Sequence, residues 1–309
     1  MKTKLLLALG IFIFHSHFSN SQGCSDAGFC TMGALNPTNN VDSSFRHKAK
    51  LSFSYGVGEQ STSHLHIIPE LQLGFIRNNE VQIKIPYIYV DGDLGSNSGL
   101  GDLSVSTSQL FQTTDKSSLS VTIGFKLPTG TTDKAENGLA LAMPYQTGLG
   151  TFDLILGVSY NYDKWRIGAG YQAILDDNNI NRYLSSNGRT EFERAYFDSN
   201  MLKRGDDALL RIERSIGWKK LDFSVGLLSI YRLQKDKIID AGGLSNSLNG
   251  SDGLTLNLTA GMNYKLSNRA SLNLLYGSPL IVRDVRADGL TRSFVVSISC
   301  QYNFSKLIK

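Results

Sequence analysis

The chain has 309 residues, with 31 Lys and Arg against 27 Asp and Glu, and a formal net charge of +4. Its mean hydropathy is −0.14, and beyond the N-terminal region no apolar stretch approaches the ~20 residues that a membrane-spanning helix needs. These values exclude a bundle of membrane helices. The small charge, with no block of like charge, gives no support for nucleic-acid binding.

The first residues have the layout of a secretory signal peptide. Lys2 and Lys4 precede an apolar run over 5–14, and the small residues Ser19 and Ser21 lie where a signal peptidase reads. We therefore predict a signal peptide over 1–21, with cleavage before Gln22. An alternative makes Cys24 a lipidated N-terminus.

Residues 22–45 lack strand periodicity and are predicted to be a periplasmic N-terminal segment or a plug of the domain that follows. Cys24 and Cys30 lie six residues apart, and in an exported protein such a pair favours a disulfide. The alternative is a soft-metal site, such as one for copper, that uses both thiols with Met32 and nearby histidines. The spacing is not a zinc signature, so no metal or cofactor is expected.

From residue 46 to 304 the sequence alternates with period two, which predicts strands, and 305–309 is predicted to be a short tail. The 30 Gly, 13 Tyr and 15 Phe beside 6 Pro suit many strands joined by tight turns. The predicted strands lie near 47–59, 63–77, 80–91, 102–113, 117–129, 150–162, 164–175, 206–218, 220–235, 253–267, 269–282 and 292–304. Most reach the ~9–11 residues that a tilted membrane strand needs.

The connections alternate in length, as a membrane barrel requires. Short polar turns are predicted at 77–80, 114–117, 162–164, 217–220 and 267–269. Longer loops are predicted at 92–101, 130–149, 176–205, 236–252 and 283–291, and the first connection at 58–62 is also short. The sequence thus predicts an all-β, transmembrane antiparallel β-barrel of about 12 strands, with 10 or 14 as alternatives. Its short turns would face the periplasm.

The last predicted strand has one apolar face and one largely polar face. Phe294, Val296, Ile298, Cys300, Tyr302 and Phe304 share one face, and polar residues fill most of the other. An apolar face with aromatics at both ends suits lipid, although a soluble β-sandwich that buries this face is the alternative. Cys300 is accordingly predicted to face lipid, and Arg214 is an exception to the pattern that a bulge or an interfacial position would relieve.

The same alternation predicts the residues that line the lumen. The candidates are His64, His66, Glu70, Lys84, Lys126, Arg166, Arg211 and Glu213, with Asp153, Asp222 and Lys265 as further members of the polar faces. Such charges can set selectivity at a constriction. Alternatively, they brace the wall by pairing across the interior.

Three short motifs carry a resemblance to a known family. Gly99-Leu100-Gly101-Asp102-Leu103 opens one strand, Lys126-Leu127-Pro128-Thr129-Gly130 closes another, and Gly148-Leu149-Gly150-Thr151-Phe152-Asp153 opens the next. Over roughly 99–175 the chain resembles the outer-membrane transporters of the MetA-pathway of phenol degradation. The resemblance implies a barrel distantly related to channels for long-chain fatty acids and aromatic compounds.

No enzyme is expected. Ser63 and His64 are neighbours on one strand and so point to opposite faces, which argues against a barrel hydrolase. We expect a passive channel for a small hydrophobic or aromatic molecule in the outer membrane of a Gram-negative bacterium. Its partners would be outer-membrane lipid, the solute and, during biogenesis, the barrel-assembly machinery. The alternative is a structural or surface-interaction barrel without transport.

Overall fold

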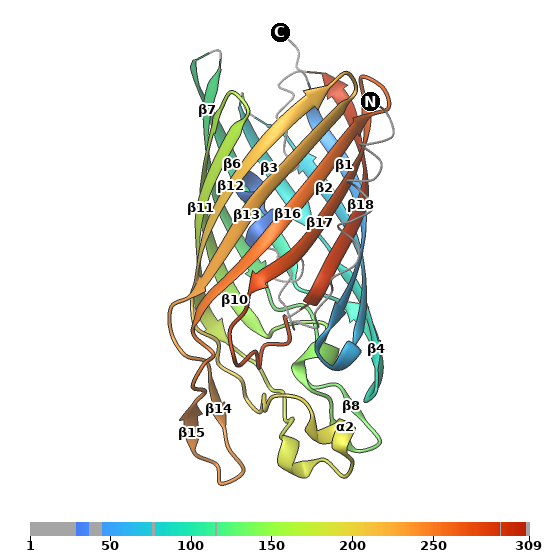
Figure 1. Cartoon of the computed structure of the whole chain (residues 1–309), viewed down its shortest axis with the longest axis vertical. Coiled ribbons are helices and arrows are strands. Elements are labelled where there is room, and N and C mark those ends of the chain that lie inside the picture. The colour runs from blue at the N-terminus through green and yellow to red at the C-terminus, as the bar shows by residue number, and fades with distance from the viewer. Residues whose placement is uncertain (1–28, 37–44, 76–77, 115, 291, 307–309) are drawn as a thin grey trace, which may run out of the picture.

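The computed structural model describes residues 29–36, 45–75, 78–114, 116–290 and 292–306. Within them the chain forms one closed antiparallel barrel with loops extending from one end (Figure 1). The predicted signal peptide over 1–21 lies outside the described residues.

Twelve wall strands form the barrel, which confirms the predicted number. The barrel closes because β1 pairs with both β2 and β18. The strands are β1 (Phe45–Gly58), β2 (Ser63–Leu73), β3 (Asn79–Lys84) continued by β4 (Tyr87–Gly92), β5 (Gly95–Leu100) continued by β6 (Leu103–Thr114), β7 (Ser117–Leu127), β10 (Thr151–Tyr162), β11 (Trp165–Asp177), β12 (Asp207–Trp218), β13 (Leu221–Arg232), β16 (Gly253–Lys265), β17 (Ala270–Ile281) and β18 (Arg292–Lys306).

The predicted long loop at 92–101 is wrong. Residues 95–100 instead form β5, which pairs with β4 through a tight turn at Gly92–Gly95. Pro86 lies between β3 and β4 and cannot donate a ladder hydrogen bond. The wall strand is interrupted there, and the Gly101 N–H donates to the Pro86 carbonyl at 2.8 Å across the break.

Long connections gather at one end of the barrel, which we call the loop end, and short hairpins at the other, the short-turn end (Figure 1). The loops contain the hairpins β8–β9 (Ala135–Glu136, Leu139–Ala140) and β14–β15 (Lys237–Ile239, Ser245–Ser247). They also contain α2 (Glu191–Arg194), which begins with a capping box between Thr190 and Glu193. The loops are therefore folded structures.

The outward faces of the strands form an apolar belt. Leu51, Phe53 and Tyr55 of β1 are exposed, while Ser52 and Ser54 between them are buried inside. Cys300 is a free, exposed cysteine, as predicted for a lipid-facing position. No helix among the described residues is long and apolar enough to span a membrane.

Arg214 keeps its predicted outward direction near the short-turn end. It is exposed and pairs in register with Trp165, which follows the turn at 163–164. Its guanidinium lies 5.3 Å from the centre of the Trp165 ring. A cation at this level can reach the membrane interface, which relieves the cost of its outward position.

Candidate functional site: the lumen of the barrel

All eight predicted lumen residues face the interior. Seven are buried and Arg166 is half-buried. Of the further members, Asp153 is fully buried, whereas Asp222 and Lys265 lie near the short-turn end, 3.8 Å apart, with side chains 31% and 60% exposed. Alternation therefore located the interior correctly. Whether these residues select the solute stays a prediction.

Residues 29–36, here called the inner segment, lie inside the barrel. The segment comprises two short 3-10 turns, η2 (Phe29–Thr31) and η3 (Gly33–Leu35). Wall side chains accept from two of its backbone N–H groups: Gln82 accepts from Gly33 at 2.9 Å and Thr122 accepts from Ala34 at 2.7 Å. A segment without strand periodicity is thus held by the polar inner face of β3 and β7.

Three cations bind carbonyl groups of the inner segment. Lys84 donates to the Thr31 carbonyl and, at 3.0 Å, to the Thr31 hydroxyl. Arg166 donates to the Ala34 carbonyl at 2.5 Å, and Arg211 donates to the Cys30 carbonyl at 3.1 Å. These anchors come from β3, β11 and β12, so one short segment joins distant parts of the wall.

An apolar cluster lies behind these anchors and was not predicted. Cys30, Met32 and Leu35 pack against three inward-facing wall residues, namely Ile155, Leu209 and Leu228. An added Cβ on Gly124 would lie 2.3 Å from the Met32 sulfur, and one on Gly157 would lie 2.9 Å from Leu35 Cγ. The available signal was the set of inward Ile, Leu and Gly residues in strands whose inner faces are otherwise polar.

Glu70 is the centre of a second polar group. It lies 3.8 Å from the Lys50 ammonium and 3.7 Å from that of Lys84, and it accepts hydrogen bonds from Gln72 at 2.8 Å and Gln82 at 2.6 Å. Gln82 and Lys84 both also contact the inner segment. Glu70 therefore orients two of the groups that hold that segment.

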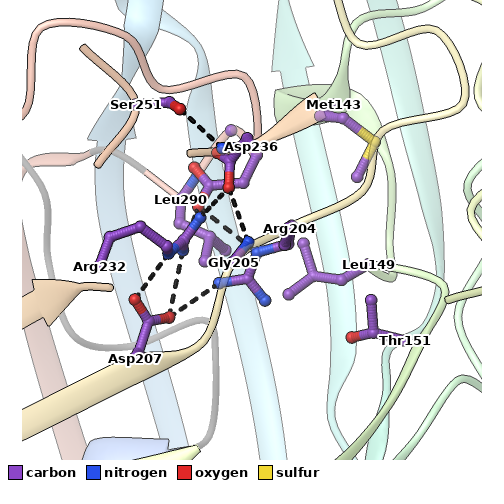
Figure 2. A network of polar contacts seen from close by, with 12 residues as sticks. Met143, Leu149, Thr151, Arg204, Gly205, Asp207, Arg232, Asp236, Ser251 and Leu290 are labelled. Carbon is purple, nitrogen blue, oxygen red and sulfur yellow. Dashed lines mark hydrogen bonds and ion pairs between the residues drawn. The ribbon is translucent and has the colours of Figure 1, made fainter. Parts of the chain in front are cut away.

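Six buried charges form a network at the loop end, which we call the loop cluster (Figure 2). Its members are Arg204, Asp207, Arg232, Asp236, Arg283 and Asp288. Arg232 contacts Asp207 at 2.7 Å, Asp236 at 2.5 Å and Asp288 at 3.0 Å. Asp236 also accepts from the Gly205 N–H at 3.0 Å, and its own N–H donates to Ser251 at 2.8 Å. The cluster joins three loops to the barrel rim.

Asp288 lies within the loop that precedes β18. Its burial alone would raise its pKa, but Arg283, Arg232 and Arg204 together hold the pKa far below its usual range. The carboxylate is therefore charged at any physiological pH. The loop cluster is a permanent ionic brace, which fits the interpretation that part of the interior charge supports the wall.

The three family motifs meet at one point of the rim. The Asp102 carboxylate accepts from the Gly130 N–H at 3.1 Å and from the Leu149 N–H at 2.9 Å. Lys126 lies 2.7 Å from Asp153 and 3.8 Å from Asp102. The motifs thus encode a junction of three strand ends.

Two glycines are required at this junction. An added Cβ on Gly130 would lie 2.6 Å from the Gly148 Cα, and one on Gly148 would lie 2.5 Å from the Asp102 carboxylate. The backbone segments after β7 and before β10 can approach only because neither carries a side chain there. This explains the glycines of the motifs without a phosphate-binding role.

A chamber fills the part of the lumen that the inner segment leaves open. The space free of atoms there is about 1580 Å³, a volume that includes open solvent. Most of its wall is formed by β1, β2, β16, β17 and β18, and Thr31 and Asn36 of the inner segment also line it. Residues 143–149, 288–290 and Arg292 close it toward the loop end. The inner segment therefore lies to one side of the lumen, beside the chamber.

Two predictions concern the sulfur-containing residues, namely a Cys24–Cys30 disulfide and, as the alternative, a soft-metal site. Cys30 is disulfide-bonded, but Cys24 lies outside the described residues, so the Cys24–Cys30 pairing stays a prediction. Met32 packs in the apolar cluster. Among the described residues, no group of three or more His, Cys, Asp or Glu side chains could hold a metal ion.

Comparisons with solved structures support the fold. The COG4313 outer membrane channel from Pseudomonas putida F1 is 15% identical, with a TM-score of 0.59 over 86% of this chain and 99% of that chain. The NanC porin is 7% identical, with a TM-score of 0.48 over 83% of this chain and 100% of that chain. The first likeness shows an outer-membrane barrel fold. A search of curated proteins gives no match.

The family resemblance extends well beyond the three motifs. A family model described as "Putative MetA-pathway of phenol degradation" matches residues 74–294, a range that contains Asp102, Lys126 and Gly148. It thus covers the rim junction, most wall strands and the loop cluster. The chain belongs to this family, as its motifs predicted.

Proposed function

We propose that the barrel is a passive outer-membrane channel for a small solute that combines an apolar, ring-sized body with a hydrogen-bonding group. The chamber inside the closed wall carries this proposal. Its lining combines apolar side chains, such as Leu275, Leu290 and Val295, with polar side chains, such as His64 and Asn257. The family description adds support for an aromatic solute.

Polar atoms in the chamber support a solute that forms hydrogen bonds. His64 Nδ1, Asn257 Oδ1 and Asn273 Oδ1 are buried and have no hydrogen-bond partner among the described residues. A buried polar atom without a partner carries an energetic penalty of ~1–3 kcal/mol. Water or the hydroxyl group of a solute would relieve it, which favours a phenol-like molecule over a pure hydrocarbon.

In this proposal the inner segment acts as a plug. It contacts wall strands on one side of the lumen and borders the chamber on the other, so its displacement widens the axial path. The covering residues 143–149 and 288–290 close the other end, where Asp288 belongs to the loop cluster. Biogenesis would use the barrel-assembly machinery, since a closed sheet must complete all its pairings in the membrane.

A second candidate is a surface-interaction barrel, favoured by the folded loops. Tyr145, Tyr183 and Tyr196 form a buried cluster there, and Phe192 nearby is 61% exposed. Swelling of proteoliposomes discriminates between the two functions. We expect arabinose to enter vesicles that carry the purified protein faster than it enters protein-free vesicles. A barrel closed to all small solutes, even without the inner segment, would contradict the channel and leave the surface function.

A further inference from the structure

A basic residue immediately precedes the returning strand in four of the five short turns. Lys116 lies before β7, Lys164 before β11, Lys220 before β13 and Arg269 before β17, whereas Asn78 takes this place before β3. All four basic side chains are exposed. We call Lys116, Lys164, Lys220 and Arg269 the collar.

Backbone hydrogen bonds fix each collar residue against the next part of the wall, because its carbonyl group accepts from an N–H there. The donors to Lys116, Lys164, Lys220 and Arg269 are, in this order, Asp163 at 2.9 Å, Ser215 at 2.8 Å, Lys265 at 2.9 Å and Asn303 at 2.8 Å. The four hairpins follow one another in the sheet. Two strand spacings separate neighbouring turns by roughly 10 Å, about one Debye length at 0.1 M salt. An anion between two neighbouring turns is therefore attracted by both cations.

The positive charge of the collar is not neutralised within the protein. Among the described residues, no carboxylate forms an ion pair with a collar side chain, and Asp222 lies 3.8 Å from Lys265 instead. Over 114–117, 162–165, 214–222 and 264–270, the sequence has seven Lys and Arg against three Asp. The short turns thus present a surplus of positive charge to their surroundings.

Two tryptophans place the collar at the edge of the membrane. Trp165 directly follows Lys164, and Trp218 lies two residues before Lys220, with side chains 46% and 64% exposed. Exposed tryptophan favours the interface between hydrocarbon and headgroups, and the long side chains of lysine and arginine extend from there toward the headgroups. Short turns of such barrels face the periplasm. The collar therefore lies beside the inner leaflet, which in an outer membrane consists of phospholipids.

We propose that the collar is a binding surface for anionic phospholipid headgroups, such as that of phosphatidylglycerol, in the inner leaflet. Ammonium and guanidinium groups bind phosphate through charge-assisted hydrogen bonds. The position beside the tryptophans favours a lipid over a soluble acidic partner. Because the collar lies on the turns and not in the lumen, the proposal does not depend on the channel function.

A charge-removal experiment with a matched control tests the proposal. The collar variant combines Lys116→Gln, Lys164→Gln, Lys220→Gln and Arg269→Gln. The control variant removes three lysines and one arginine from exposed positions at the loop end, with Lys134→Gln, Arg189→Gln, Lys203→Gln and Lys237→Gln. Both variants change the net charge equally, so they separate the collar from a general effect of charge.

Native mass spectrometry of the purified protein gives the dissociation constants of the first bound phosphatidylglycerol and of the first bound phosphatidylcholine. We expect the wild type and the control variant to bind phosphatidylglycerol at least fivefold more tightly than phosphatidylcholine. In the collar variant this preference should fall below twofold. Replacement of the three collar lysines by arginine should preserve it. A boiling-dependent gel shift confirms folding of each variant.

Four results would overturn the proposal. The first is a wild type without the preference, and the second is a collar variant that keeps it or loses no more of it than the control does. The third is displacement of phosphatidylglycerol by an equal concentration of glycerol 3-phosphate, which would identify free phosphate as the ligand. The fourth is binding of poly-glutamate more tightly than phosphatidylglycerol, which would point to an acidic protein as the partner.

Discussion

Two sets of cations lie in the lumen, and they have different kinds of partner. In the loop cluster, Arg232 touches three carboxylates. At the inner segment, Arg166 and Arg211 donate to backbone carbonyls, and Arg211 also lies 3.8 Å from the Glu213 carboxylate. A carboxylate that leaves a buried guanidinium exposes an unpaired charge, whereas water can replace a carbonyl as hydrogen-bond acceptor. We therefore expect the loop cluster to be the fixed part of the lumen and the inner segment to be the displaceable part.

The largest effect is expected from breaking the loop cluster. Asp288→Ala removes a partner from Arg204, Arg232 and Arg283 at once. Removal of one partner from a buried pair typically destabilises by ~3–5 kcal/mol. We expect rapid trypsin cleavage within 200–290 and larger conductance. Asp284→Ala, in the same loop but exposed, is the control and should change neither readout.

A pH series tests the loop end separately from the inner segment. Glu59 at the loop end titrates, whereas the backbone carbonyls of the inner segment do not. Burial raises the pKa of Glu59, in the connection between β1 and β2, to about 7, although Arg286 at 2.8 Å opposes the shift. The folded state thus binds a proton that the unfolded chain releases near pH 4.5. This stabilisation is complete below pH 4.5 and is lost as the pH rises through about 7.

The shift corresponds to at most ~3 kcal/mol. We therefore expect the free energy of unfolding in urea to fall between pH 5 and pH 8 in the wild type. Glu59→Gln should flatten that dependence, and an equally steep fall in Glu59→Gln would contradict the assignment.

Loss of an anchor should release the inner segment. Arg166→Met removes the donor to the Ala34 carbonyl, and hydrogen bonds to charged groups contribute ~1.5–3 kcal/mol. A change of that size shifts a docked-to-released ratio by roughly 10- to 100-fold. Single-channel records should show longer open times. Lys164→Met, in an exposed turn close to Arg166 along the chain, should leave them unchanged.

Overpacking tests the same docking without changing charge. Gly124→Ala places a methyl group on the Met32 sulfur, which we expect to weaken docking by ~1–3 kcal/mol. Met32→Ala in the same chain should recover part of the loss, because it empties the contested space. Open times measured on the two single variants and the double variant give this coupling directly. Additive effects would show that Met32 does not dock against Gly124.

The smallest effect is expected away from both cation sets. Arg214→Gln removes the guanidinium above Trp165, and an exposed cation–π contact contributes ~0.5–1 kcal/mol. We expect a small loss of stability and no change in conductance. A conductance change in this variant would show that the outward face at the short-turn end affects the lumen.

The repeating parts of the molecule were predictable from sequence, and the unique ones were not. Period-two alternation predicted the twelve strands and the inward direction of His64 and Arg211, because successive side chains of every strand point to opposite faces. The loop at 92–101 was assigned wrongly because Gly95 and Gly99 suggest a turn, whereas residues 95–100 pair fully with β4. The partners of Arg232 come from β12 and from two loops, which meet only after folding. No local pattern encodes that meeting.

Both tryptophans of the chain lie at the short-turn end, Trp165 after one hairpin turn and Trp218 before another. Intrinsic fluorescence therefore reports the environment of a single rim. A variant that has lost the loop cluster would keep a native tryptophan emission spectrum. A folding experiment followed by tryptophan emission would report the native state when only the short-turn end had folded. A fluorophore placed on the loops, for example at Leu244, which is 68% exposed, would make the other half of the barrel visible.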